Sequence, residues 1–215
     1  MEYKILVFGD SITRGAWDTR YWWRVNRLKL YFDKIWLSHK IKFVTVYNLW
    51  VAGDDTIQLL DRFGNEIIWK STKDSKIIVI FAIGMNDTMF DIKNQKVFTD
   101  QKIFLDNINL LFQKAKKHTN NILCIGFNPV DESRLDPVPW FDAQISYKNV
   151  FIKEYNNLIL DQCKKCDISF VEIFDEFVKY WNYNELLDDD WLHPNSKWHN
   201  LVFGIIKRKI NKLFF

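Results

Sequence analysis

Short runs of apolar residues alternate along the chain with longer segments in which apolar residues recur at helical spacing. The runs show little polar alternation, which is typical of strands buried on both faces of a parallel sheet. The strongest run is Ile77–Ile83, which we expect at the centre of the sheet. The expected strands are 5–8, 43–47, 77–83, 122–127 and 168–173. The expected helices are 22–39, 56–70, 99–118, 144–166 and 195–213. Thr56 is suited to cap the second of these helices.

This alternation of strand and helix predicts an α/β fold in which helices cover both faces of a parallel sheet. The 215 residues can bury a sizeable core, so we expect a single domain over residues 1–215. One segment departs from the pattern: 128–143 holds three of the four prolines and has no clear period. Such irregular stretches are usually functional or mobile. Because it follows the fourth strand, we expect it at the carboxyl edge of the sheet, where ligands bind.

Composition narrows the class of protein. Hydrophobic residues make up 48% of the chain and charged residues 27%, which is typical of a globular protein. The net charge of +3 is too small to indicate a nucleic-acid partner. No signal peptide precedes the first strand, and no apolar run approaches the roughly 20 residues of a membrane span. We therefore expect a cytoplasmic protein without a membrane span; the pattern predicts no particular oligomeric state.

Three cysteines, Cys124, Cys163 and Cys166, form an odd set that fits a reducing compartment. The spacing of Cys163 and Cys166 is that of a metal or redox site. A zinc site would need two more ligands, and the neighbouring sequence offers none. We interpret the pair as ordinary thiols at a helix end, and we expect neither a metal nor a cofactor.

Ser11 stands where the first strand delivers the chain to the ligand-binding edge. A serine there is a candidate nucleophile, but it needs a base and an oxyanion site from elsewhere in the chain. The alternative is an ordinary turn in which Asp10 and Ser11 cap the next helix.

His193 precedes the last expected helix, and Asp190 lies three residues upstream. This spacing lets the carboxylate meet one imidazole nitrogen while the other faces outward, which is the base that a serine hydroxyl needs. A surface histidine in an acidic loop is the alternative. Four of the seven glycines also fall close to strand ends: Gly9, Gly15, Gly53 and Gly84. Strand–helix turns favour glycine anyway, but this leaves the neighbouring Asn86 unexplained.

These residues resemble the sequence blocks of a known family. Gly9-Asp10-Ser11-Ile12-Thr13 resembles the first block of the SGNH (GDSL-type) hydrolases. Gly53 is similar to their second block, Gly84-Met85-Asn86-Asp87 to the third, and Asp190-Trp191-Leu192-His193-Pro194 to the fifth. The blocks occur in order from residue 9 to residue 194, so the resemblance covers nearly the whole chain.

The resemblance implies a three-layer α/β/α sandwich with a flavodoxin-like five-stranded parallel sheet in the order 2-1-3-4-5. It implies a serine esterase or acylhydrolase that cleaves a carboxylic ester or thioester of a small molecule through an acyl-enzyme. In this interpretation Ser11 is the nucleophile, His193 the general base and then acid, and Asp190 the residue that orients His193. The backbone N–H groups of Ser11 and Gly53 and the side-chain amide of Asn86 would hold the oxyanion.

The irregular segment suggests where the substrate binds. Trp140 and Phe141 have no periodic place in a helix or strand, so we expect them to form one wall of the substrate pocket. Trp17, Met89 and Phe90 are the expected opposite wall. The alternative is that Trp140 and Phe141 only tack the loop to the core.

The chain departs from the resemblance at a few bulky positions. Family members often have glycine where Trp191 and Trp198 stand, and Gly-Gly-Trp where residues 21–23 read Tyr-Trp-Trp, which implies bulkier walls and a narrower acyl pocket. Other functions stay open: a carbohydrate O-deacetylase on the same site, a catalytically silent small-molecule-binding module, or a phosphate- or flavin-binding domain. The sequence lacks the glycine-rich cradle that a phosphate- or flavin-binding domain needs, and such a domain would have no use for Asp190 and His193.

Overall fold

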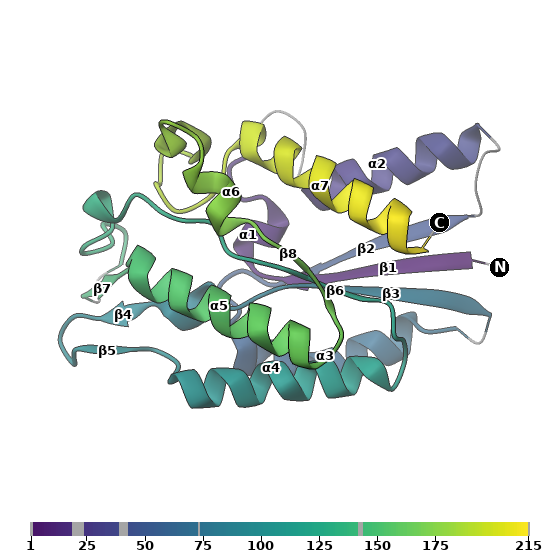
Figure 1. Cartoon of the computed structure of the whole chain (residues 1–215), viewed down its shortest axis with the longest axis horizontal. Coiled ribbons are helices and arrows are strands. Elements are labelled where there is room, and N and C mark those ends of the chain that lie inside the picture. The colour runs from purple at the N-terminus through teal and green to yellow at the C-terminus, as the bar shows by residue number, and fades with distance from the viewer. Residues whose placement is uncertain (1, 19–23, 39–42, 73, 142–143, 215) are drawn as a thin grey trace.

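The central sheet of the computed structural model contains five parallel strands (Figure 1). The structure describes residues 2–18, 24–38, 43–72, 74–141 and 144–214. The strands of this sheet are β1 (Glu2–Gly9), β2 (Val44–Trp50), β3 (Ser75–Ala82), β6 (Ile122–Ile125) and β8 (Ser169–Val171). Their spatial order is β2-β1-β3-β6-β8, which is 2-1-3-4-5 when they are counted along the chain. The predicted α/β fold and strand order are therefore confirmed.

Helices form the two outer layers. The α-helices are α1 (Ser11–Arg14), α2 (Arg24–Leu37), α3 (Thr56–Lys70), α4 (Gln101–Lys116), α5 (Asn149–Lys165), α6 (Phe174–Val178) and α7 (Ser196–Phe214). The short 3-10 helices are η1 (Asn86–Thr88), η2 (Glu132–Arg134) and η3 (Tyr183–Leu186). Helices α2 and α7 cover one face of the sheet, and α3, α4 and α5 cover the other (Figure 1). Strand–helix–strand connections of a parallel sheet commonly place helices on both faces in this way.

The middle strands are buried on both faces, as their unbroken apolar runs predict. In β1, Leu6 and Phe8 join the core under α3, α4 and α5, whereas Ile5 and Val7 join the core under α2 and α7. Complete burial of one such side chain stabilises the folded state by about 1.5–3 kcal/mol. The edge that carries the site therefore rests on a rigid support.

A second, three-stranded antiparallel sheet corrects one expectation. Its order is β5-β4-β7, with β4 at Phe90–Asp91, β5 at Lys96–Val97 and β7 at Ile145–Ser146. Because β7 pairs with β4, the helix expected from residue 144 begins only at Asn149. Strands of two residues are too short to produce a recognisable period.

The start of α3 also differs from the prediction. Thr56 is the first residue of α3 rather than its cap; the cap is Asp55, which exchanges hydrogen bonds with Gln58 in a capping box. Helix α2 spans Arg24–Leu37, and residues 22, 23 and 39 of the expected helix lie outside the described residues.

The irregular segment 128–143 is anchored by residues other than its two large aromatic ones. Val130, Leu135 and Val138 are fully buried in the core, whereas Trp140 and Phe141 remain 44% and 46% exposed. Residues 142 and 143 lie outside the described residues. The three aliphatic side chains, rather than Trp140 and Phe141, therefore provide most of the contact that anchors this loop to the core.

In the described part of the chain, none of the helices combines the length and the apolar character needed to cross a membrane. All three cysteines are free thiols. Cys124 and Cys163 are buried in the core, and Cys166 is the C-cap of α5. The hydrogen bond with Cys163 and burial both raise the pKa of the Cys124 thiol, which keeps it protonated.

Candidate active site

Ser11 begins helix α1 directly after the turn that ends β1. The turn needs glycine at position 9, because a Cβ there would lie 2.0 Å from Oγ1 of Thr13 and 2.4 Å from the carbonyl oxygen of Ala82. The Thr13 hydroxyl donates a 3.1 Å hydrogen bond to that same carbonyl. Close packing of α1 on the end of β3 thus holds Ser11 at the carboxyl edge of the sheet.

Asp10 caps the same short helix. Its buried carboxylate accepts the backbone N–H groups of Ile12 at 2.9 Å and Thr13 at 3.4 Å. The capping interpretation of this motif is correct for Asp10, and it is compatible with a reactive Ser11, because the cap itself fixes the turn that presents the serine.

His193 connects Ser11 with Asp190. Its Nε2 lies 2.7 Å from Oγ of Ser11, a residue 182 positions away in the chain, and its Nδ1 lies 2.5 Å from Oδ2 of Asp190. The imidazole is mostly buried, so both contacts are shielded from water. A hydroxyl, an imidazole and a carboxylate in this sequence of contacts can transfer a proton from the serine to the histidine.

The Asp190 loop is folded so that the carboxylate meets several donors. Oδ1 of Asp190 accepts the backbone N–H groups of Leu192 at 3.1 Å and His193 at 2.9 Å. Trp191 adopts a left-handed φ of 59° to make this turn. Burial raises the pKa of Asp190, but the hydrogen bonds and charge of His193 and the two N–H groups outweigh it and lower the pKa overall. Asp190 is therefore a stable anion beside the imidazole.

Asn86 begins η1 after β3, with its side chain held at both ends. Nδ2 donates a 2.8 Å hydrogen bond to the carbonyl oxygen of Asp54, and Oδ1 accepts one of 3.0 Å from the hydroxyl of Tyr147. Tyr147 is fully buried, and this burial raises the pKa of its hydroxyl, which stays a donor. These contacts use one of the two Nδ2 hydrogens and leave the other for a ligand.

Tyr147 is a functional candidate that the sequence interpretation missed. It lies in a segment whose pattern predicts a helix, and no motif marks it. Its partner Asn86 is 61 residues away in the chain. Only the pairing of β7 with β4, which displaces the start of α5, brings the two together.

Gly53 lies in the turn between β2 and α3. It has a φ of +79°, and apart from Gly53 and its two chain neighbours no heavy atom of the described residues lies within 4 Å of the position that a Cβ would occupy. An open backbone of this kind can approach a ligand closely. Gly53 immediately precedes Asp54, the residue whose carbonyl holds Asn86.

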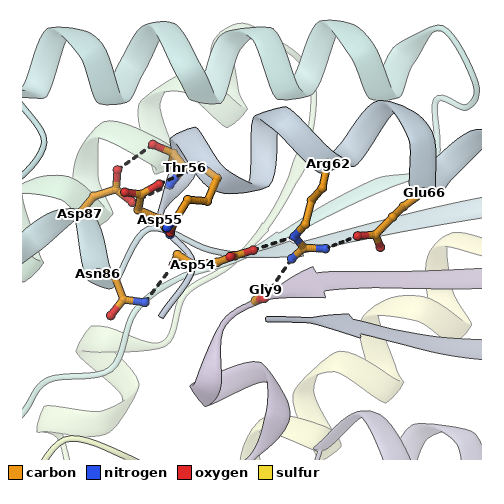
Figure 2. Close-up of polar contacts among 9 residues, drawn as sticks. Gly9, Asp54, Asp55, Thr56, Arg62, Glu66, Asn86 and Asp87 are labelled. Carbon is orange, nitrogen blue, oxygen red and sulfur yellow. Dashed lines mark hydrogen bonds and ion pairs between the residues drawn. The ribbon is translucent and has the colours of Figure 1, made fainter. Parts of the chain in front are cut away.

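Asp87, next to Asn86, ties η1 to the start of α3 (Figure 2). Its carboxyl group accepts the N–H of Thr56 at 3.0 Å and the Thr56 hydroxyl at 2.6 Å. Burial raises the pKa of Asp87 to about 7, although the hydrogen bonds from Thr56 oppose the shift. This buried carboxyl is a structural anchor for the turn that carries Asn86.

A cavity of about 550 Å³ borders Asp190. Its lining consists of Trp17, Pro139, Trp140, Asp188, Asp189, Asp190 and Trp191. Trp17 and Trp191 have φ values of 67° and 59°. Bulky residues rarely adopt this region, and such strain, about 1–3 kcal/mol per residue, is concentrated at functional sites. Trp17 and Trp140, two of the predicted wall residues, thus meet at one cavity with Trp191.

The other predicted wall residues lie elsewhere. Phe90 is turned toward the core and stacks on Phe151 with ring centroids 5.2 Å apart. Met89 is partly buried against the same core. Phe141 lies beside Trp140, with centroids 6.4 Å apart, and is not among the residues that line the cavity.

The bulky positions at which the chain departs from the family pattern also lie in different parts of the structure. Trp198, on α7, is buried against Phe177 and supplies core packing instead of a wall near the site. Trp191 does border the cavity, and Cζ of Arg134 lies over its ring, 4.9 Å from the centroid. Residues 21–23 lie outside the described residues.

A second hollow, of about 610 Å³, lies between α2 and α7 and is lined largely by lysine, arginine and aromatic side chains. Its lining includes none of Ser11, Asp190 and His193, whereas Asp190 lines the smaller cavity. Among the described residues, no group of three or more histidine, cysteine, aspartate or glutamate side chains is arranged to hold a metal ion.

Comparison with known proteins places this geometry in context. The family model of the GDSL-like lipase/acylhydrolase family matches residues 7–201. A curated relative, the uncharacterized protein YpmR of Bacillus subtilis (strain 168), is 23% identical over 211 residues, which are 97% of this chain and 81% of that protein. The match spans all four sequence blocks.

Solved structures share the fold at low identity. A lipase/acylhydrolase from Enterococcus faecalis superposes with a TM-score of 0.75 at 21% identity, covering 97% of this chain and 95% of that one. Axe2, an acetylxylan esterase from Geobacillus stearothermophilus, gives a TM-score of 0.71 at 17% identity, covering 96% and 93%.

Proposed function

The chain belongs to the GDSL-like lipase/acylhydrolase family, and we propose that it is a serine esterase that cleaves a carboxylic ester of a small molecule through an acyl-enzyme. The observation that carries this proposal is the 2.7 Å contact between Oγ of Ser11 and Nε2 of His193, whose other nitrogen meets Asp190. A surface histidine in an acidic loop would have no reason to meet a serine 182 residues away.

In the first step, Nε2 of His193 takes the proton of the Ser11 hydroxyl while Oγ bonds to the ester carbonyl carbon. The carbonyl oxygen becomes an oxyanion. When this intermediate collapses, the bond to the alcohol oxygen breaks, and His193 gives its proton to that oxygen. Asp190 accepts the Nδ1–H of His193 throughout, which fixes the tautomer and stabilises the imidazolium.

In the second step, a water molecule takes the place of the alcohol. His193 removes one of its protons as the water oxygen attacks the acyl carbon. The second tetrahedral intermediate releases Oγ of Ser11, which recovers a proton from His193, and the carboxylic acid leaves. The same base and acid thus serve both half-reactions.

The oxyanion is held by the backbone N–H groups of Ser11 and Gly53 and by the free Nδ2 hydrogen of Asn86. The open left-handed turn at Gly53 and the two-sided anchoring of the Asn86 amide support this assignment. Each donor of this type contributes about 2.7–4 kcal/mol of transition-state stabilisation. An asparagine amide keeps this role at any pH because it does not titrate.

Trp17, Trp140 and Trp191 are the proposed walls of the substrate pocket, because they line the cavity that borders Asp190. A related candidate function is O-deacetylation of a carbohydrate at the same site. The three aromatic side chains, combined with the carboxylates of Asp188 and Asp189, favour a substrate with both apolar faces and hydroxyl groups.

A fluorophosphonate probe tests the nucleophile. We expect single labelling of the wild type, hydrolysis of p-nitrophenyl acetate, and loss of both in Ser11→Ala. Ser75→Ala, at the opposite end of the sheet, is the matched control and should keep both. Labelling that persists in Ser11→Ala contradicts the serine mechanism, and an unlabelled wild type favours a silent binding module. Acetylated xylo-oligosaccharides in the substrate panel separate the deacetylase from a simple esterase.

A further inference from the structure

Arg62, on α3, contacts both turns that would form the oxyanion site (Figure 2). Its Nε donates a 2.7 Å hydrogen bond to Oδ2 of Asp54, and its Nη2 donates one of 3.4 Å to the carbonyl oxygen of Gly9. Its Nη1 binds Glu66, one turn further along the same helix, at 2.7 Å. One guanidinium group therefore bridges two loops and its own helix.

The two partners flank the reactive groups in the sequence. Gly9 precedes Asp10 and Ser11, and its carbonyl oxygen also accepts the N–H of Val51 at 3.0 Å. Asp54 follows Gly53, and its own carbonyl oxygen accepts the Nδ2 hydrogen bond of Asn86 at 2.8 Å. A displacement of Asp54 would therefore move the Gly53 N–H and the Asn86 amide together.

The side chains of Arg62 and Asp54 are largely buried, and the geometry of their contacts suits an arginine. The side chain of Asp54 is 5% exposed and that of Arg62 is 19% exposed. Burial raises the pKa of Asp54 overall, although the hydrogen bond and the charge of Arg62 oppose this rise. A planar guanidinium reaches three acceptors at fixed angles, whereas a lysine ammonium is a single flexible point charge.

We propose that Arg62 is a positioning residue: through Asp54 and the Gly9 carbonyl it fixes the distance between Ser11 and the oxyanion donors Gly53 and Asn86. This inference rests on the proposed function, because it concerns the same site. Arg62 does not touch the substrate, so its effect is on the rate of the chemical step and not on substrate binding.

The first test compares Arg62→Gln with Glu66→Gln, which removes only the outer ion pair of the same guanidinium. We expect kcat for p-nitrophenyl acetate to fall about 10- to 100-fold in Arg62→Gln with KM within about twofold, because small misplacements of catalytic groups have effects of this size. Arg62→Lys should recover only part of the loss, and Glu66→Gln should keep the wild-type kcat. If Arg62→Gln does not fold, Arg62→Lys supplies the comparison.

A kcat decrease smaller than about fivefold in the Arg62 variant, or an equal decrease in Glu66→Gln, overturns the proposal. So does a purely thermal effect, in which the melting temperature falls but kcat is retained. In an Asn86→Ala background the effect of Arg62→Gln should shrink, because the two changes disable the same oxyanion site. If the double variant instead shows the product of the two single losses in kcat, the two residues act independently, and the positioning role of Arg62 is overturned.

A nuclear magnetic resonance measurement separates this inference from the proposed function. In ¹⁵N-labelled protein, Arg62→Gln should shift or broaden the backbone amide of Gly53 and the side-chain amide of Asn86, while Glu66→Gln leaves both unchanged. Unchanged signals in Arg62→Gln overturn the positioning role. If the wild type hydrolyses no ester and its Ser11 is not labelled, the proposed function fails, and these two signals still decide whether Arg62 orders the site.

Discussion

The hydroxyl group of Tyr147 donates a 3.0 Å hydrogen bond to Oδ1 of Asn86. This contact determines which end of the amide faces which partner, because the opposite end donates to the carbonyl oxygen of Asp54. Tyr147 is fully buried in the core that α3, α4 and α5 cover, so the orientation of the amide is decided by packing as well as by the hydrogen bond.

Tyr147→Phe is expected to lower kcat about tenfold while KM changes little, because the Asn86 amide loses the partner that orients it for the oxyanion. Steady-state kinetics with p-nitrophenyl acetate measure this split. Tyr155→Phe is the matched control: Tyr155 is also buried, and its hydroxyl donates to the carbonyl oxygen of Thr99. Tyr155→Phe should lower the free energy of unfolding by about 1 kcal/mol without lowering kcat. Equal kinetics in the two variants would contradict the role of Tyr147.

Trp140→Ala is expected to change the ratio of kcat/KM for butyrate and acetate esters at least severalfold. A pocket wall discriminates acyl groups by about 1–3 kcal/mol per methylene, and Trp140 lines the cavity next to Asp190. Trp181, which is 102% exposed, offers a matched control, since Trp181→Ala removes an indole without touching that cavity. An unchanged ratio in Trp140→Ala, with a lower melting temperature, would reassign Trp140 to anchoring the loop.

Asp87→Asn is expected to flatten the pH dependence of stability. The pKa of Asp87 is about 7 in the folded protein, against about 3.9 for an ordinary aspartate. Between these values the folded state holds a proton that the unfolded state has lost, so the free energy of unfolding falls as the pH rises through this window. Between pH 5 and pH 8, the free energy of unfolding should fall by on the order of 2 kcal/mol more in the wild type than in Asp87→Asn.

Urea denaturation at pH 5, 6, 7 and 8 measures this difference. Asp106→Asn, which changes an exposed carboxylate on α4, is the control. It should follow the wild-type pH profile. Parallel profiles for the wild type and Asp87→Asn would show that Asp87 is ionised in the folded state over the whole range.

Gly84→Ala is expected to destabilise the fold by about 2–4 kcal/mol. Its φ is +119°, and a Cβ would lie 2.7 Å from the ring of Phe127 and 2.9 Å from that of Phe104. Gly64, inside α3, has open space at the same position, so Gly64→Ala should stabilise the protein by about 0.5–1 kcal/mol. Denaturation midpoints of the two variants on opposite sides of the wild type would bear out this difference; a shift in the same direction would contradict it.

The apolar pattern by itself predicted an α/β fold with a parallel sheet, and the family resemblance predicted the strand order. Ile77–Ile83 has no polar alternation, and its strand is the buried centre of the sheet with β1 and β6 on either side. The order of the motifs also predicted that Ser11, Asp190 and His193 would gather at one edge. The structure places them within hydrogen-bonding distance. Both inferences depend on local features of the sequence. These are the hydrophobic periodicity within one segment and short motifs whose residues lie close together in the chain.

The tertiary structure alone decided which side chains meet across distant segments. Tyr147 reaches Asn86, and Arg62 reaches Gly9, only because separate elements pack at particular depths and angles. The same packing turned Phe90 into the core and brought Trp191 to the cavity beside Trp17. No spacing along the chain encodes these contacts, since each depends on how two independently formed elements are oriented when the core between them closes.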